Sequence, residues 1–309
     1  MKKFNVVLLI TAVMLLVGNF SVPTQAQSPA SQMKPTFLAP TPGTYVHGWP
    51  AFAVSYPKDW VEQPARPGEV IRVADPNSKT VPRIPNFVIT VFPIPLPIDS
   101  WSKIFLPIFS RSGRDFKIMY DKPSQLKDGT PAQEAELEWI RNDGVRVNML
   151  LLNTRKYAPW ISIIAASDKG KIDEDLKNYA YSLTFQPARE EPVKVPSDVQ
   201  EFLNRFCGDL VSGNMERIIP NYSEQFLHQS MNKAFLEQWF RNDPISPIQL
   251  GVTSSEPTVT IFEAQGDKAY VDGFYTSKMR NAANAVRIPM NNQQIIKENG
   301  QWKWYGNQK

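Results

Sequence analysis

Proline is the residue that most constrains how this sequence can fold. The chain has 27 prolines among 309 residues, whereas average usage is about 5%. Because proline lacks a backbone N–H group and has a fixed φ, it interrupts helices and the interior of sheets. We therefore predict short strands separated by turns rather than a long helical bundle. Since 42% of the residues are hydrophobic, the chain has enough apolar side chains to bury cores.

The first 26 residues have the pattern of a secretory signal peptide. Lys2 and Lys3 form a basic start, and an apolar stretch follows over residues 6–17. Thr24 and Ala26 are the small residues expected before a cleavage site after Ala26. The apolar stretch is shorter than the roughly 20 residues that span a bilayer. The sequence therefore predicts export, to the periplasm or outside the cell, with no transmembrane segment after cleavage.

Charge and cysteine content argue against two classes of function. The chain has 34 basic and 30 acidic residues, and no run of basic residues is longer than two. A nucleic-acid-binding surface normally needs a clustered basic face, so we do not expect nucleic acid as a partner. Cys207 is the single cysteine, which excludes an internal disulfide. No histidine stands near it in the sequence to activate it as a nucleophile, and we predict a buried side chain.

Two proline-rich segments divide the chain. Residues 27–43 are rich in serine, proline and glutamine and have no periodicity, so we predict a disordered spacer. Residues 187–196 contain three prolines and an acidic pair, and such spacing keeps a chain extended. We predict a linker there, between a first domain at 44–186 and a second at 197–309. Both domains are predicted to have an α+β fold.

The clearest element of the first domain is a hairpin between residues 135 and 152. Its first strand has one apolar face and one acidic face, the latter made of Glu134, Glu136 and Glu138. A three-residue loop at 142–144 sets Trp139 opposite Val147 and Leu137 opposite Met149, whereas a two-residue loop would set Trp139 opposite Asn148. We choose the first register because it pairs apolar side chains. Further strands are expected at 52–56, 70–73, 87–92 and 160–166, with a helix at 171–183 and a shorter one after Ser100.

The segment FAVSYPKDW at 52–60 resembles the opening strand and turn of PsbP-like domains. The later order of hairpin, strand and C-terminal amphipathic helix resembles the same family. This resemblance implies an antiparallel sheet with covering helices and a role in protein contacts. The family includes an extrinsic subunit of photosystem II, which implies the thylakoid lumen if the host is a cyanobacterium. No metal-binding or docking residue of the family has a counterpart in this sequence.

The second domain has its helices before its strands. Ser197 and Gln200 are spaced as a capping box at the start of a helix with an apolar stripe over 199–211. Shorter helices are expected at 222–228 and 232–241. Asn299-Gly300 predicts a type I′ hairpin that sets Trp302 opposite Lys297 and Trp304 opposite Ile295. Strands are expected at 249–253, 258–264, 268–275, 286–290, 293–298 and 301–305.

Three helices followed by a curved antiparallel sheet resemble the nuclear transport factor two-like (SnoaL-like) fold. The leading helix with Ser212-Gly213-Asn214 and the ending QWKWY at 301–305 resemble that family's usual shape. The resemblance implies a cone-shaped domain that encloses an apolar cavity for a small apolar ligand, or that forms a homodimer through its sheet. The residues implied to line the cavity are Tyr222, Phe226, Trp239, Phe240, Tyr270, Phe274, Trp302 and Trp304.

Groups for catalysis are scarce. Enzymes of the resembled fold use an Asp or His base with a Tyr or acid donor, and the weak candidates here are Tyr222, His228 and Asp272. We expect His228 to lie near a helix end in an exposed or capping role and Asp209 to face outward, while the facing of Asp272 stays open. The three glutamates of the hairpin diverge from one another, so we predict a solvated acidic face and no metal site. No cofactor motif occurs.

The function predicted from these observations is that of an exported, non-catalytic binding or assembly protein. One alternative is an isomerase-like or hydrolase-like enzyme that uses the cavity of the second domain. Another is a lumenal subunit associated with photosystem II, if the host is a phototroph.

Overall fold

The computed structural model describes residues 41–66, 68–80, 83–92, 98, 100–111, 113–156, 159–187, 190–243 and 246–308. The predicted signal peptide and the predicted spacer up to residue 40 lie outside this range. Contacts divide the described chain into two compact units, each of which is α+β, as predicted. Residues 41–46 and 52–186 form the first unit, and residues 47–51 join the part from residue 187 onward in the second. Residues 47–51 therefore differ from the prediction, which places them in the first domain.

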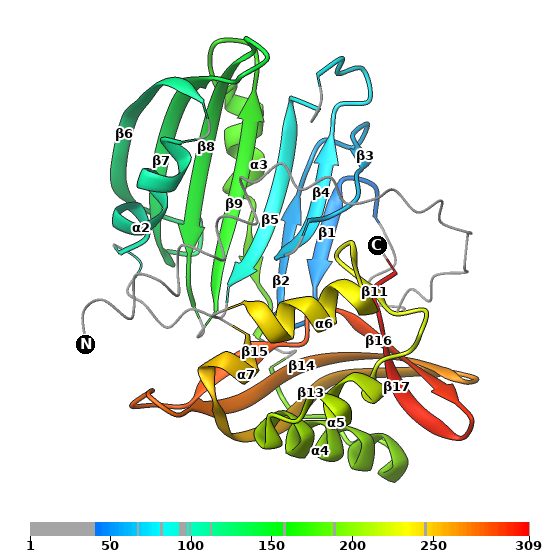
Figure 1. Cartoon of the computed structure of the whole chain (residues 1–309). Coiled ribbons are helices and arrows are strands. Elements are labelled where there is room, and N and C mark those ends of the chain that lie inside the picture. The colour runs from blue at the N-terminus through cyan, green and yellow to red at the C-terminus, as the bar shows by residue number, and fades with distance from the viewer. Residues whose placement is uncertain are drawn as a thin grey trace. The chain divides into compact units, whose positions relative to one another are not determined.

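The first unit is built on a seven-stranded antiparallel sheet (Figure 1). In spatial order its strands are β3 (Val61–Glu62), β4 (Glu69–Ala74), β5 (Asn86–Phe92), β9 (Trp160–Ser167), β8 (Arg146–Thr154), β7 (Pro131–Ile140) and β6 (Arg114–Gln125). A smaller sheet contains β1 (Thr44–His47), β2 (Phe52–Ser55) and β10 (Thr184–Phe185). Trp60 donates its backbone N–H to the Pro57 carbonyl, which closes the predicted turn after β2.

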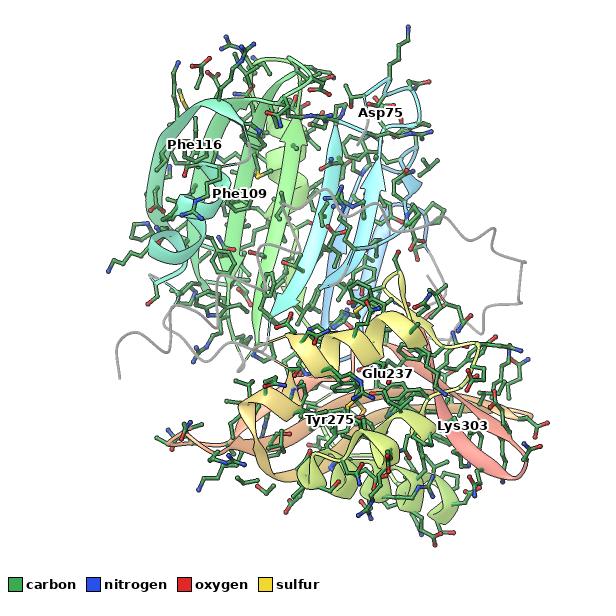
Figure 2. The ribbon with its side chains drawn as sticks, in the orientation of Figure 1. Asp75, Phe109, Phe116, Glu237, Tyr275 and Lys303 are labelled. Atoms are coloured by element: carbon green, nitrogen blue, oxygen red, sulfur yellow. The ribbon has the colours of Figure 1, made fainter. Side chains whose placement is uncertain are left out.

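Apolar side chains cover both faces of the large sheet. One layer includes Leu176 and Ala180 of α3 (Glu174–Ala180), and the other includes Phe105 and Phe109 of α2 (Ser100–Phe109). Because neighbouring residues of a strand point to opposite faces, the central strands β5 and β9 are buried at every position. Their sequences are therefore long, mostly apolar runs without alternation. Figure 2 labels Phe109, together with Phe116 of β6, which packs against the same layer.

The predicted register of the β7–β8 hairpin is confirmed. Trp139 pairs with Val147 and Leu137 with Met149, so the loop has three residues. Gly144 has φ +86°, a left-handed conformation that glycine adopts at little cost. In this register Arg146 forms an ion pair of 3.0 Å with Glu138.

Three local predictions in the first unit were incomplete. The helix expected at 171–183 is shorter, because Asp173 is the N-cap and accepts a hydrogen bond from the Leu176 N–H group. Helix α2 contains Pro107 and continues to Phe109. Strand β6 was not predicted, because it forms one end of the sheet and is half-buried or exposed along its whole length. Its sequence therefore has no apolar face to identify it.

The second unit has four α-helices, a five-stranded sheet and a two-stranded sheet among its described residues. The helices are α4 (Ser197–Ser212), α5 (Met215–Ile218), α6 (Lys233–Asn242) and α7 (Pro247–Leu250). Between α5 and α6 lie the 3-10 turn η3 (Ile219–Asn221) and a hairpin of β11 (Leu227–His228) and β12 (Met231–Asn232). The antiparallel sheet has the order β13 (Val252–Gln265), β14 (Lys268–Met279), β16 (Gln293–Glu298) and β17 (Gln301–Gly306), and β15 (Val286–Pro289) also pairs with β14. We refer to it as the β13–β17 sheet.

The β16–β17 hairpin has the predicted register and turn. Trp304 pairs with Ile295 and Trp302 with Lys297. Asn299 and Gly300 have φ values of +51° and +79°, as a type I′ turn requires. The two strands expected at 249–253 and 258–264 are instead one strand, β13. It tolerates Pro257 because it is an edge strand, whose outer side needs no ladder hydrogen bonds.

Two helix predictions in the second unit were wrong. Helix α4 begins at Ser197, but its N-cap is Pro196 and no side chain caps it, so the predicted capping box is absent. The segment 222–228 is not helical; it leaves η3 and enters β11. No helix in the described part of the chain is both long and apolar enough to cross a bilayer.

Candidate functional site

The structure divides the predicted aromatic pocket between two faces of the β13–β17 sheet. One face packs against α4, and the core there contains Tyr222, Phe226, Phe240, Trp302 and Trp304, with Trp239 partly buried against it. Val271 and Tyr275 of β14 also belong to this core, and Figure 2 labels Tyr275. Residues of a strand alternate between faces. Tyr270 and Phe274 therefore lie on the other face.

Aromatic rings on the α4 face pack against one another. Phe206 of α4 lies 5.8 Å from Tyr222, 5.9 Å from Tyr275 and 5.7 Å from Trp304 between ring centroids. Tyr222 also lies 5.0 Å from Phe226, edge-on. These distances are those of favourable aromatic pairs within a core.

The three weak catalytic candidates do not come together. Tyr222 is buried on the α4 face, and burial raises the pKa of its hydroxyl well above the ordinary value. His228 is buried in β11 rather than exposed at a helix end, and burial lowers its pKa to about 3. Asp272 is fully buried on the opposite face of the sheet, next to Tyr270.

Asp272 lies under the segment His47–Ala51. Its Oδ2 atom accepts a hydrogen bond of 3.1 Å from the Trp49 N–H group, and its Oδ1 atom accepts one of 2.7 Å from Gly273. The Tyr270 hydroxyl donates to Asn292 at 2.6 Å and lies 3.5 Å from Asp272. Burial raises the pKa of Asp272 to about 7, although these donors act in the opposite direction.

Asp209 and Cys207 of α4 are both buried, and their contacts are those of structural residues. Asp209 is buried rather than facing outward, and it accepts hydrogen bonds from Arg217 and Asn221, both of 2.9 Å. Cys207 is buried as predicted, and burial raises the pKa of its thiol to about 11. A thiol with a raised pKa is a poor nucleophile near neutral pH.

The acidic face of the hairpin is not fully solvated, contrary to the prediction. Glu134 is buried and accepts hydrogen bonds from the Tyr120 and Tyr181 hydroxyls, of 2.6 Å and 2.5 Å. Lys177 of α3 forms an ion pair of 3.1 Å with it. Across the described residues, no three or more His, Cys, Asp or Glu side chains form a group suited to a metal ion.

A cavity of about 420 Å³ in the first unit has a basic lining. It is formed by the segment after β3, by β4, and by the loop that leads into β5. Four of its ten lining residues are basic and none is acidic; the ten are Gln63, Pro64, Arg66, Arg72, Ala74, Ser78, Lys79, Thr80, Arg83 and Asn86. We call this cavity the basic pocket. Its volume lies within the range of small-molecule sites.

Arg72 is a fixed cation in the basic pocket. Its Nη2 and Nε atoms both donate to Glu69, which is buried: Nη2 donates to Oε1, and Nε donates to Oε2 at 2.9 Å. The Arg66 backbone N–H group donates to the same oxygen at 2.8 Å. This bidentate pairing holds the guanidinium in one orientation.

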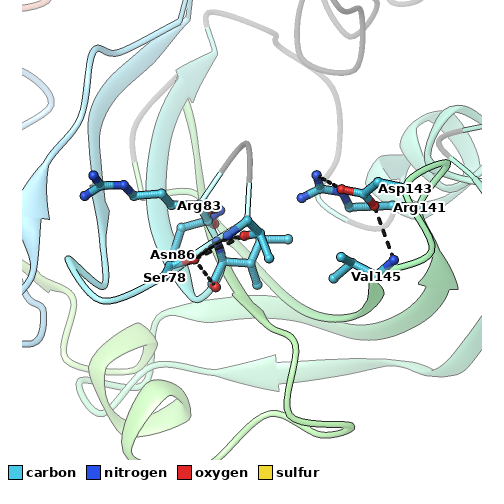
Figure 3. A network of polar contacts seen from close by, with 8 residues as sticks. Ser78, Arg83, Asn86, Arg141, Asp143 and Val145 are labelled. Carbon is cyan, nitrogen blue, oxygen red and sulfur yellow. Dashed lines mark hydrogen bonds and ion pairs between the residues drawn. The ribbon is translucent and has the colours of Figure 1, made fainter.

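The loop that carries Lys79 and Arg83 is held by its own polar contacts (Figure 3). The Ser78 hydroxyl donates to the Ile84 carbonyl at 2.6 Å, and the Ile84 N–H group donates to Thr80 Oγ1 at 2.7 Å. The Asn86 amide donates to the Arg83 carbonyl at 2.7 Å. Figure 3 shows the Arg83 side chain extending away from this network. Lys79 and Arg83 are exposed, and neither forms an ion pair with another described residue.

Like charges are crowded around Arg66. Burial lowers the pKa of its guanidinium, and repulsion from Arg72 and Arg141 lowers it further, while Glu69 acts in the opposite direction. Arg141 is paired with Asp143 at 2.5 Å (Figure 3). Two cations and one carboxylate thus act on the Arg66 guanidinium.

The sequence analysis did not identify the basic pocket. Its four cations lie within 24 residues, 63–86, which also contain Glu69 and Asp75. No two of these cations are adjacent in the sequence, so a search for basic runs overlooks them. They come together because β4 pairs with β5 and the connecting loop folds back beside them.

Comparisons with known proteins give distant structural similarity. No family model matches the chain, and no curated protein matches its sequence. The solution structure of a cyanobacterial PsbP from Synechocystis sp. PCC 6803 is similar, with 15% identity, a TM-score of 0.38, and coverage of 52% of this chain and 99% of that one. A crystal structure from Bacteroides thetaiotaomicron VPI-5482 has 13% identity, a TM-score of 0.34, and coverage of 87% and 90%. A Pseudomonas aeruginosa protein of unknown function has 14% identity, a TM-score of 0.26, and coverage of 45% and 83%.

Proposed function

We propose that this chain is an exported, non-catalytic binding protein whose first unit holds a small anionic ligand in the basic pocket. The observation that carries the proposal is the convergence of Arg66, Arg72, Lys79 and Arg83 around one cavity of about 420 Å³. Guanidinium groups bind carboxylate and phosphate oxygens through paired hydrogen bonds. A ligand with such oxygens would offset the repulsion that Arg66 experiences from its basic neighbours.

The four cations differ in their surroundings, and this difference supports a ligand-binding role for the basic pocket. Arg72 is already paired with Glu69, so it shapes the pocket and contributes a fixed positive charge. Lys79 and Arg83 are neighbours in the sequence of Ser78, Thr80 and Ile84, which are joined by hydrogen bonds. Backbone that is held in this way loses little conformational entropy when a ligand binds. Lys79 and Arg83 are therefore the proposed ligand contacts.

For the second unit we propose a nuclear transport factor two-like fold, with its aromatic residues acting as a core. The order of the elements supports this, because α4, α5 and α6 precede the β13–β17 sheet. The packing of Phe206 against three other rings supports the role of the aromatics as core residues. The proposed lack of catalysis is supported by the separation of Asp272 from Tyr222 by the sheet. The basis for proposed export is the pattern of residues 1–26.

The test is calorimetric titration of the full exported chain at low ionic strength with inorganic phosphate and, separately, with citrate. We expect saturable binding of at least one of them. Arg83→Gln and Lys79→Gln should each weaken it about tenfold, which is the loss of one charge-assisted hydrogen bond. Lys169→Gln, at an exposed lysine of the same unit, should leave the affinity unchanged. Failure of both anions to bind, or equal weakening by Lys169→Gln, would reject the proposal.

A further inference from the structure

The segment His47–Ala51 is held on the β13–β17 sheet by two carboxylates. Asp272 accepts the Trp49 N–H group at 3.1 Å. Glu190 accepts the Trp49 indole N–H group at 2.6 Å and the Ala51 N–H group at 3.1 Å. Two backbone donors and one side-chain donor of this five-residue segment thus depend on two acidic side chains.

The fit between the segment and Asp272 is close. A Cβ atom added to Gly48 would overlap the Asp272 carboxylate, so only glycine is accommodated there. The Gly48 N–H group donates to Asn292 Oδ1 at 3.1 Å. The Trp49 side chain is fully buried, and its ring lies 4.5 Å from that of Phe274. Water has no access to the carboxylate while the segment is in place, because Asp272 has no exposed surface.

Among the described residues, the groups that act on the Asp272 pKa include no cation. His47 lies in the segment itself and contacts Asn292, and burial lowers its pKa to about 3, so it stays neutral above that pH. Tyr270 is beside Asp272 on β14, and Tyr275 lies on the opposite face of the sheet. Glu190 is acidic, and the cation Arg287 stacks on Phe274 at 4.6 Å from the ring centroid. An ionised Asp272 is thus stabilised by hydrogen-bond donors alone.

We propose that the protonation of Asp272 controls whether His47–Ala51 stays on the β13–β17 sheet. Protonated Asp272 holds the segment against the sheet, and ionised Asp272 favours release of the segment. A buried carboxylate without a cation is costly, and opening of the segment returns it to water. The neutral acid has no such cost and still accepts the Trp49 N–H group. The segment is therefore a local opening unit whose stability depends on the protonation of one side chain.

The direction of the pH dependence follows from linkage. The pKa of Asp272 is about 7 with the segment closed and about 4 when the group is in water. The closed form therefore binds more protons between these values. Closure is strongest below pH ~4, weakens by about tenfold per pH unit up to pH ~7, and is constant above that.

The experiment is hydrogen exchange of the Trp49 amide in the full chain, followed by NMR and corrected for the intrinsic effect of pH. We expect the protection factor to fall about tenfold per unit between pH ~4 and ~7. Asp272→Asn should abolish this slope. Tyr270→Phe removes a hydroxyl that lies 3.5 Å from the carboxylate and that lowers its pKa, so it should shift the end of the slope to higher pH. This variant provides a test if Asp272→Asn does not fold.

Two matched variants distinguish the effect of Asp272 protonation from a pH-independent loosening of the His47–Ala51 segment. Glu190→Gln should lower protection at every pH and keep the slope, because Asp272 is unchanged. Asp267→Asn, at an exposed aspartate in the β13–β14 turn, should change neither. A protection factor that does not vary with pH in the unaltered chain, or a slope that persists in Asp272→Asn, would overturn the proposal.

Discussion

The indole ring of Trp304 on β17 lies edge-on to the ring of Phe206 on α4, with 5.7 Å between centroids. Phe202, one helical turn earlier, lies 5.4 Å from the same indole. Trp304 has 1% of its surface exposed. The last strand of the sheet thus packs against α4 through Trp304, and the Trp302 indole of the same strand donates a hydrogen bond of 2.8 Å to Asp198 of α4.

Replacement of Trp304 with alanine should destabilise the second unit strongly. Removal of a fully buried aromatic side chain costs about 3–5 kcal/mol, because the lost contacts leave a cavity. The measurement is urea unfolding of the full chain, followed by tryptophan fluorescence and circular dichroism. Val211→Ala, at an exposed position of α4, is the control and should change the unfolding free energy by about 0.5 kcal/mol or less. A loss below about 1 kcal/mol for Trp304→Ala would show that Trp304 does not fasten the core.

Short-range patterns predicted part of this unit correctly. Asn299-Gly300 set the register of β16 and β17 because a type I′ turn requires two residues with positive φ, and few sequences provide them. The stripe over 199–211 predicted a buried face of α4 from six apolar residues at helical spacing; five of them are buried, and Val211 is exposed. In both elements, interactions between residues that are close in the sequence determine the local structure.

Long-range contacts explain what the sequence did not predict. The facing of Asp272 depends on residues 47–51, which come more than 200 positions earlier. His228 is buried because β11 packs beside β17, where Gly306 approaches the Leu227 carbonyl. The basic pocket requires a loop to bring Lys79 and Arg83 beside Arg72. None of these relationships produces a periodic pattern in the sequence.

Two glycine-to-alanine replacements should have opposite effects. Gly208 lies inside α4, and a Cβ added there meets no atom within 4 Å. Gly208→Ala should therefore stabilise the chain by about 0.5–1 kcal/mol, because alanine restricts the unfolded chain and favours helix. At Gly48 the added Cβ overlaps the Asp272 carboxylate, so Gly48→Ala should destabilise the protein by about 1–3 kcal/mol.

Thermal and urea unfolding of the two glycine variants under identical conditions measure both effects. Gly208→Ala is the control for Gly48→Ala, because both variants add one methyl group. A neutral Gly48→Ala would mean that the His47–Ala51 segment does not lie closely on the sheet. A destabilising Gly208→Ala would mean that the outer surface of α4 is covered.

The ionisation of Glu134 should make the stability of the first unit depend on pH in the acidic range. Burial acts to raise the pKa of Glu134, but hydrogen bonds from Tyr120, Tyr181 and Lys177 outweigh it, and the pKa lies below its ordinary value. Burial raises the pKa of the Tyr181 hydroxyl to about 12, and its hydrogen bond to Glu134 acts in the same direction. A carboxylate with a lowered pKa stabilises the folded state above its unfolded value, and this contribution is lost as the pH falls through the folded value.

Glu134→Gln should therefore cost about 2 kcal/mol at neutral pH, since it removes charge-assisted hydrogen bonds while it keeps the shape of the side chain. The cost should shrink at acidic pH, where Glu134 in the unaltered protein is itself protonated. Urea unfolding at neutral pH and at a pH below the ordinary glutamate pKa measures both values. Glu201→Gln, at an exposed position of α4, should cost little at either pH. An equal cost of Glu134→Gln at both pH values would show that the charge of Glu134 contributes nothing, and that its hydrogen bonds to the two tyrosines act as neutral contacts.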